Sequence, residues 1–182
     1  MYDASVTNYA FIDGQNLHKG IQELGWSLDY RRFRIYLKEK YDVGKTFIVM
    51  GYVATNAELY TALQNYGYTL IFKPILTYKD GKVKGNCDAD LVLNVMTRIG
   101  EFEQAVIVSG DGDFYCLIKY LNDRSKLRMI LVPDENSYSA LLKSFAAGRL
   151  AGINVQRKKL EYRKTPRKDG TVRSAFRGDT RK

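Results

Sequence analysis

The 182-residue chain has little of what several classes of site and fold require. Its two cysteines, Cys87 and Cys116, are too few for a disulfide framework. A single histidine, His18, excludes the usual histidine-rich zinc sites. We therefore expect a protein of a reducing, intracellular compartment, and specifically a cytoplasmic one.

Long hydrophobic runs are also missing. The longest, over residues 47–54, is far too short to cross a bilayer, and residues 1–7 lack the basic and apolar regions of a signal peptide. No Gly-x-x-x-x-Gly-Lys sequence occurs, and Gly110-x-Gly112 lacks the third glycine of a dinucleotide site. With 45% hydrophobic residues and only 3 prolines, the chain is predicted to form one soluble domain with a sizeable core.

The net charge of +9 is unevenly distributed along the chain. Residues 157–182 hold 11 Lys and Arg against 3 acids, a net charge of +8, whereas residues 1–156 have a net charge of +1. Because residues 157–182 also contain few apolar side chains, we predict a folded domain over 1–156 and a basic, disordered arm over 157–182. Such an arm is suited to binding polyanions; the alternative is that it serves solubility alone.

Apolar stretches alternate with helical patterns along the predicted domain. Buried strands are expected at residues 9–13, 45–53, 68–75, 105–108 and 127–132, with a short one at 153–155. Helices are expected at residues 16–24, 29–41, 56–66, 88–99, 113–122 and 137–147, and a hairpin around Asp-Gly at 77–84. This alternation predicts a three-layer α/β sandwich with a mainly parallel sheet.

Two of the predicted buried strands end in aspartates. Asp13 ends the first strand, and Asp111 and Asp113 follow the strand at 105–108. In open α/β sheets, ligands bind at the carboxyl ends of the strands. A helix cap would explain one of the paired aspartates but not both. At helical spacing Asp113 falls on the same apolar face as Leu117, where a carboxylate is costly unless it is paired or metal-bound.

A third acidic position lies at the start of the helix predicted at 88–99. On that helix Asp88 projects to the centre of the apolar stripe, while Asp90 points about 200° away. We therefore predict Asp88 as a site residue and Asp90 as a solvated or supporting acid. Together with Asp13, Asp111 and Asp113, Asp88 would form a repulsive cluster unless a cation neutralises it. Oxygen-only ligands suit Mg²⁺ or Mn²⁺.

These acids lie in three motifs: Phe11-Ile12-Asp13-Gly14-Gln15-Asn16-Leu17, Lys84-Gly85-Asn86-Cys87-Asp88 and Val108-Ser109-Gly110-Asp111-Gly112-Asp113-Phe114. Together they resemble the motifs of NYN domains, which belong to the PIN-like nuclease superfamily, and in particular those of its bacterial LabA-like (DUF88) branch. The resemblance covers residues 8–156, in the order and spacing of that family.

The resemblance implies a PIN-like, Rossmannoid fold and metal-dependent ribonuclease activity. By position, it implies that metal is bound by Asp13, Asp88, Asp111 and Asp113. It further implies that Asn16 and Ser109 support the metal ligands or hold a phosphate. Many PIN-like domains carry another acid one or two helical turns beyond the Asp88 position, where this chain has Asn94. The resemblance therefore leaves a second metal open.

The sequence thus predicts a metal-dependent ribonuclease that hydrolyses phosphodiester bonds in single-stranded or flexible RNA. A bound metal would lower the pKa of a water molecule and offset charge on the scissile phosphate. The candidate RNA-binding residues are Lys79, Lys82, Lys84, Arg157, Lys158, Lys159, Arg163 and Lys164. The alternatives are a catalytically weak RNA-binding or regulatory module, and a small-molecule phosphohydrolase, against which the charge of the arm argues.

Overall fold

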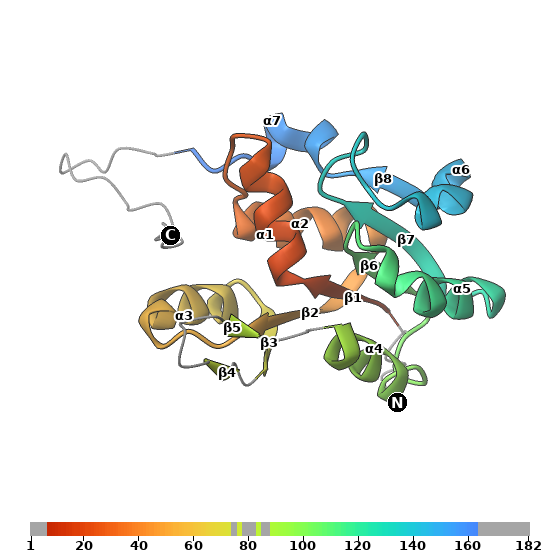
Figure 1. The fold of residues 1–182 in the computed structure, drawn as a ribbon, viewed down its shortest axis with the longest axis horizontal. Coiled ribbons are helices and arrows are strands. Elements are labelled where there is room, and N and C mark those ends of the chain that lie inside the picture. Colours follow the sequence, from red (N-terminus) through yellow and green to blue (C-terminus); the bar gives the residue numbers. More distant parts are fainter. Residues whose placement is uncertain (1–6, 74–75, 78–82, 85–87, 164–182) are drawn as a thin grey trace, which may run out of the picture.

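The computed structural model describes residues 7–73, 76–77, 83–84 and 88–163. Within these residues a six-stranded sheet has the order β3-β2-β1-β6-β7-β8 (Figure 1). Every neighbouring pair in it is parallel. Its strands are β1 (Asn8–Asp13), β2 (Val43–Gly51), β3 (Tyr68–Lys73), β6 (Ala105–Val108), β7 (Leu127–Val132) and β8 (Leu150–Gly152). The predicted three-layer α/β fold is confirmed.

Helices cover both faces of this sheet (Figure 1). The α-helices are α1 (Gly14–Glu23), α2 (Tyr30–Tyr41), α3 (Ala57–Asn65), α4 (Asp88–Thr97), α5 (Tyr115–Asp123), α6 (Ala146–Arg149) and α7 (Arg157–Leu160). The 3₁₀ turns are η1 (Ala54–Asn56), η2 (Gly112–Phe114), η3 (Ala140–Phe145) and η4 (Asn154–Gln156). The strands β4 (Leu76–Thr77) and β5 (Val83–Lys84) pair antiparallel, as the predicted hairpin requires, and the turn between them lies outside the described residues.

The core consists of two apolar layers separated by the sheet. On one side Phe11 of β1 packs in a cluster with Leu91 of α4 and Leu117 of α5. On the other side Ile12 packs with Leu17 of α1, and this second cluster continues to α2 and α3. Because neighbouring β1 side chains are buried on opposite faces, the strand is apolar at almost every position, which explains its continuous hydrophobic run.

The part of the domain after β7 differs from the prediction. The stretch expected to be a helix at 137–147 forms η3 and the short α6, which is broken where Gly148 adopts a φ of +90°. The backbone N–H of Ser139 donates to the carbonyl of Gly110 at 3.0 Å, which holds this segment to the loop after β6. The short strand expected at 153–155 lies three residues earlier, as β8, because residues 150–152 pair with β7.

Part of the segment predicted as a disordered arm is folded onto the domain. Residues 157–160 form α7, and the side chain of Leu160 is only 1% exposed. The backbone N–H of Asp29 donates to the carbonyl of Leu160, and that of Tyr162 to the carbonyl of Ser27, both at 2.8 Å. The predicted boundary at residue 156 is therefore wrong for residues 157–162. Residues 164–182 lie outside the described part of the chain.

We expect Leu160→Ala to lower the free energy of unfolding of the full chain by about 2–5 kcal/mol, because it empties a buried leucine site. Val155→Ala is the matched control, since Val155 is 58% exposed a few residues earlier, and a change of about 0.5 kcal/mol or less is expected. Urea denaturation at equilibrium measures both variants. Equal midpoints for Leu160→Ala and the wild type would show that α7 does not contribute to folding stability.

Candidate active site

The buried carboxylate of Asp13 is the centre of the candidate site. Asp13 ends β1 and is 5% exposed. Its Oδ1 accepts hydrogen bonds from the backbone N–H groups of Gln15 at 3.1 Å and Asn16 at 3.0 Å, so it caps the N-terminus of α1. Its Oδ2 accepts a long hydrogen bond from the Ser109 hydroxyl at 3.4 Å. The cap fixes one oxygen and leaves the other directed toward the loop after β6.

The predicted supporting residues Asn16 and Ser109 join the loop after β1 to the loop after β6. The amide oxygen of Asn16 accepts from the backbone N–H of Gly110 at 2.9 Å. The hydroxyl of Ser109, a completely buried residue, accepts from the backbone N–H of Asp111 at 3.2 Å. These two bonds fix the position of Asp111 relative to Asp13.

Asp111 and Asp113 take different positions, although a single glycine separates them. Oδ1 of Asp111 accepts from the backbone N–H of Asp113 at 3.0 Å and caps η2. Asp113 is exposed, and Phe114 is completely buried in its place. The prediction that Asp113 lies on the apolar face of its helix is therefore wrong. The buried side chains Phe114, Leu117, Ile118 and Leu121 follow regular helical spacing, and their face begins one residue after Asp113.

The glycine between these two aspartates is required by packing. A Cβ atom at Gly112 would overlap the hydroxyl of Ser139 and would lie 3.0 Å from its Cβ. Ser139 belongs to the segment that is held to Gly110. A larger residue at position 112 would therefore displace the loop that carries Asp111.

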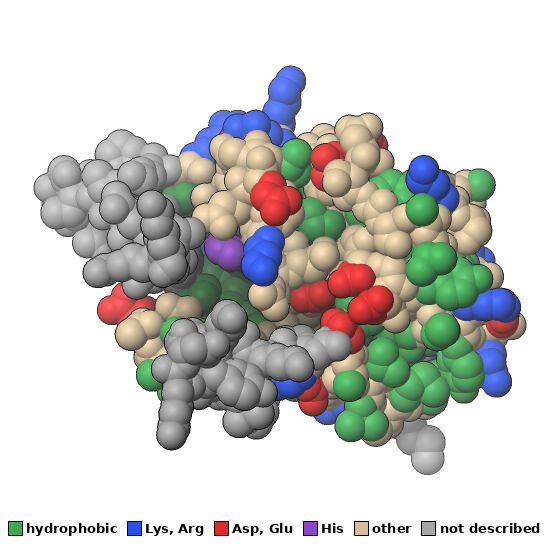
Figure 2. Space-filling model, viewed as in Figure 1, with side chains coloured by type: hydrophobic (Ala, Val, Ile, Leu, Met, Phe, Trp, Pro, Cys, Tyr) green, Lys and Arg blue, Asp and Glu red, His purple; other side chains and the backbone are tan. Residues whose placement is uncertain are grey.

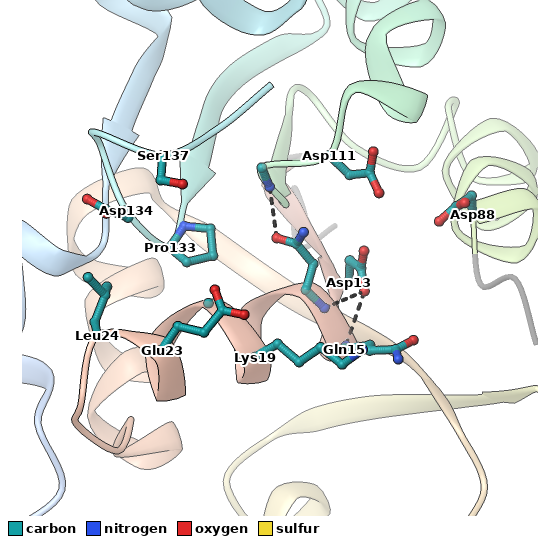
Figure 3. Close-up of a pocket in the computed structure, with 13 residues that line it drawn as sticks. Asp13, Gln15, Lys19, Glu23, Leu24, Asp88, Asp111, Pro133, Asp134 and Ser137 are labelled. Carbon is teal, nitrogen blue, oxygen red and sulfur yellow. Dashed lines mark hydrogen bonds between the residues drawn. The ribbon is translucent and has the colours of Figure 1, made fainter. Parts of the chain in front are cut away.

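A pocket of about 690 Å³ lies in front of these loops, with side chains from several segments around it (Figure 3). The residues that line it are Asp13, Gln15, Asn16, Lys19, Gly20, Glu23, Leu24, Asp88, Gly110, Asp111, Pro133, Asp134 and Ser137. The carboxylates of Asp13, Asp88 and Asp111 surround one end of the pocket (Figure 3). The structure thus brings three of the four predicted metal ligands together, and Asp113 does not line the pocket.

The pocket raises the pKa of Asp13 above the ordinary carboxyl value of 3.8. Burial is the largest cause, and the negative charges of Asp88 and Asp111 add to it. The hydrogen bonds from the backbone N–H groups of Asn16 and Gln15 oppose this rise. The ionised form of Asp13 is therefore held at a cost, which a bound cation would offset.

The first turn of α4 separates the roles of its two aspartates. Leu91 and Val95 are buried against the sheet, as the predicted apolar stripe requires, and Asp88 faces the pocket. The carboxylate of Asp90 lies 3.6 Å from the ammonium of Lys73 on β3 and does not line the pocket. Asn94 occupies the position where many PIN-like domains have an acid, and its amide oxygen accepts from the Arg98 guanidinium at 2.7 Å.

Comparison with known proteins identifies the family of the chain. The model of the NYN domain family matches residues 9–169. The chain belongs to the NYN domain family. Members of this family are PIN-like, RNA-related nucleases, which fits three acidic side chains at the carboxyl ends of parallel strands and an adjacent helix.

Two further proteins resemble this NYN domain along most of its length. The "Low amplitude and bright protein LabA" of Synechococcus elongatus is 27% identical over 169 residues, which cover 86% of this chain and 88% of LabA. A crystal structure of a protein of unknown function from Vibrio parahaemolyticus superimposes with a TM-score of 0.70 at 19% identity. That match covers 89% of this chain and all of the other, and it supports the fold.

The far end of the pocket contains polar residues that the sequence analysis did not single out. Lys19 and Glu23 continue the face of α1 that begins with Gln15, at a spacing of four residues. Asp134 follows β7 and accepts from the amide nitrogen of Asn154 at 2.8 Å. The sequence could have indicated Asp134, because this aspartate closely follows the buried strand β7, as Asp111 follows β6.

The predicted RNA-binding lysines and arginines lie away from the pocket wherever the structure describes their side chains. Arg157, Lys158, Lys159 and Arg163 are exposed on and after α7, and Arg157 forms an ion pair with Glu161 at 2.8 Å. Lys84 belongs to β5, and Lys79, Lys82 and Lys164 lie outside the described residues. Acidic side chains gather at the centre of the face that carries the pocket (Figure 2). Among the described residues, every helix is too short or too polar to span a membrane.

The raised pKa of Asp13 predicts a pH-dependent effect of Asp13→Asn on stability. Between pH 3.8 and the higher pKa of the folded state, the native protein binds more protons than the unfolded chain, so its stability falls as the pH rises through that window. Asparagine keeps the capping oxygen and removes the charge. In EDTA, the stability of Asp13→Asn relative to the wild type should therefore be greater at pH 7 than at pH 4.

Urea denaturation at the two pH values provides the measurement. Asp29→Asn is the control, because Asp29 caps α2 through the backbone N–H of Arg32 at 3.0 Å and lies outside the pocket. The same trend in both variants would show that the effect does not arise from the pocket. A large loss of stability in Asp13→Asn at pH 7 would show that the charge of Asp13 supports the fold.

Proposed function

We propose that this NYN domain is a metal-dependent ribonuclease that hydrolyses phosphodiester bonds in single-stranded or flexible RNA. The observation that supports the proposal is the convergence of Asp13, Asp88 and Asp111 on one pocket from three separate segments. A helix-capping role would explain the position of Asp13 alone. It does not explain why the carboxylates of Asp88 and Asp111 face the same pocket and raise the pKa of Asp13.

The donor set fits Mg²⁺ or Mn²⁺ that keeps part of its water shell. Asp13, Asp88 and Asp111 supply oxygen atoms, which hard divalent cations prefer. No group of three or more His, Cys, Asp or Glu side chains in the described part of the chain is arranged to hold a metal ion by itself. Mg²⁺ usually binds through one or two carboxylates and retains several waters, so it does not require a closed group of three side chains. The metal would supply a water of lowered pKa and offset phosphate charge.

Other residues of the pocket are suited to holding the RNA backbone. The Asn16 amide oxygen is occupied by the N–H of Gly110, so the amide nitrogen remains as a donor in the pocket wall. Lys19 is the one lysine or arginine among the described residues that line the pocket. We assign to both side chains the binding of phosphate oxygens, which orients the scissile bond relative to the carboxylates.

A second candidate function is an RNA-binding module with little catalysis. The observation that favours it is that the described acids form no closed ligand group. The two functions share the pocket and differ in whether RNA is cut. Labelled single-stranded RNA incubated with purified protein and Mn²⁺, with and without EDTA, separates them: cleavage that EDTA abolishes supports the ribonuclease, and binding without cleavage supports the module.

We expect Asp13→Asn and Asp111→Asn to reduce the cleavage rate by about two orders of magnitude or more, because each removes a charged oxygen ligand. Both variants keep a capping oxygen, so the fold should persist. Initial rates at saturating Mn²⁺ measure the effect, and RNA binding in EDTA serves as the control for folding. Cleavage by either variant at the wild-type rate would contradict its assignment as a metal ligand.

The two aspartates of α4 give a sharper comparison. Asp88→Ala should lose about as much activity as Asp13→Asn, because Asp88 faces the pocket. Asp90→Ala should retain activity within about threefold, since it loses only a partly exposed ion pair with Lys73 and such pairs contribute little. The same cleavage assay measures both variants. Equal losses would show that Asp90 also acts in the pocket.

A further inference from the structure

An exposed cluster of aromatic rings lies near the end of β2. The side chain of Tyr52 is 52% exposed and that of Phe72 is 40% exposed, while Tyr60 of α3 is buried behind them. The ring centroids of Tyr52 and Phe72 are 5.4 Å apart, and those of Tyr60 and Phe72 are 4.6 Å apart. Two exposed rings held side by side give this edge of the sheet an accessible aromatic surface.

The cluster is held in place by backbone hydrogen bonds. The N–H of Tyr52 donates to the carbonyl of Lys73 at 3.4 Å, and the N–H of Val53 donates to the hydroxyl of Tyr60 at 2.8 Å. Tyr52 and Phe72 are therefore fixed relative to each other while their rings remain accessible. A preorganised surface of this kind loses little conformational entropy on binding.

The strand register places the backbone of Phe72 near that of Asp13, at the same end of the sheet. Asp13 pairs with Val49 of β2, and Val49 pairs with Ile71 of β3. Phe72 is therefore one residue further along and two strands away from Asp13, a Cα separation of roughly 10 Å from the usual spacing and rise. The ion pair between Lys73 and Asp90 also connects this edge of the sheet to the first turn of α4.

The first turn of α1 allows this approach because residue 14 is glycine. A Cβ atom there would lie 2.9 Å from Ile48 Cγ2 and 3.0 Å from the carbonyl oxygen of Val49. The helix that carries Gln15 and Asn16 therefore lies directly against the end of β2. The same Cβ atom would lie 3.4 Å from the Cβ of Met50, which pairs with Phe72, so this turn connects the Asp13 loop to the strands that carry the aromatic cluster.

We propose that Tyr52 and Phe72 form a stacking surface for an unpaired base of RNA whose backbone enters the acidic pocket. This inference rests on the proposed ribonuclease function and names the feature of the substrate that is recognised. Aromatic rings stack on bases of any sequence, and such stacking positions single strands beside polar channels. Bases in a duplex are already stacked on one another, so the surface favours single-stranded RNA.

The test measures the binding of a fluorescent single-stranded RNA by anisotropy in EDTA, where no metal-dependent cleavage occurs. Tyr52→Leu and Phe72→Leu keep an apolar side chain and remove the ring, and each should raise Kd by roughly 5- to 150-fold. Tyr52→Phe and Phe72→Tyr keep the ring and should stay within about twofold. Ile35→Ala on α2 is the control for loss of an exposed apolar side chain, since Ile35 is 46% exposed.

The RNA provides a second, independent arm of the test. An oligonucleotide with abasic sites should bind the wild type more weakly than the intact RNA does. Its Kd, and that of a duplex, should be the same for Tyr52→Leu and the wild type. Unchanged Kd in both leucine variants would overturn the stacking surface even if the wild type cleaves RNA. Loss of binding in these variants supports the surface even if the wild type does not cleave.

A second copy of the chain is the other occupant that the test distinguishes, because β3 is an edge strand of the described sheet. Sedimentation of the wild type and of Tyr52→Leu provides the measurement. A wild-type dimer that Tyr52→Leu dissociates, with RNA affinity unchanged, would overturn the proposal.

Discussion

The buried carboxylate of Asp13 is the constraint on which the site depends. Its position at the end of β1 is favourable because two N–H groups at the start of α1 donate to it. The same position is unfavourable because the residue is buried and faces Asp88 and Asp111. The fold offsets part of this cost through backbone hydrogen bonds, and a cation would offset the rest. Neither the capping of α1 nor the repulsion from Asp88 and Asp111 accounts by itself for where Asp13 lies.

The sequence predicted the strands better than the later helices, for a physical reason. Strands such as β1 are buried on both faces, so their apolar runs stand out from the rest of the chain. The segment at 137–147 is held in part by tertiary contacts, such as the hydrogen bond from Ser139 to Gly110 and the burial of Leu142, which no local pattern records. Asp113 was misplaced because the face that packs on the core runs through Phe114, Leu117 and Ile118, one residue further along than the apolar pattern indicated.

The candidate site was predictable where it followed from strand ends and a regular helix. Asp13 and Asp111 follow central strands, and Asp88 begins α4, so topology brings them together. Lys19 and Asp134 line the same pocket because the loop after β7 packs against α1, where a Cβ at Gly20 would overlap Pro133, and this depends on tertiary packing. The extent of the folded domain was misjudged because Leu160, a single apolar residue, anchors a short basic helix that composition assigns to a tail.

Under the proposed function, the distribution of charge explains how an acidic pocket and a basic chain serve one protein. The exposed cations on and after α7 attract a polyanion over a distance of about one Debye length, roughly 10 Å at moderate salt. Within the pocket the carboxylates would repel the same backbone. Attraction and repulsion are reconciled if a divalent cation occupies the carboxylates, since it converts a repulsive pocket into one that accepts phosphate. Binding of RNA at the cations of α7 and at the rings of Tyr52 and Phe72 would then need no metal, while entry of the scissile phosphate would.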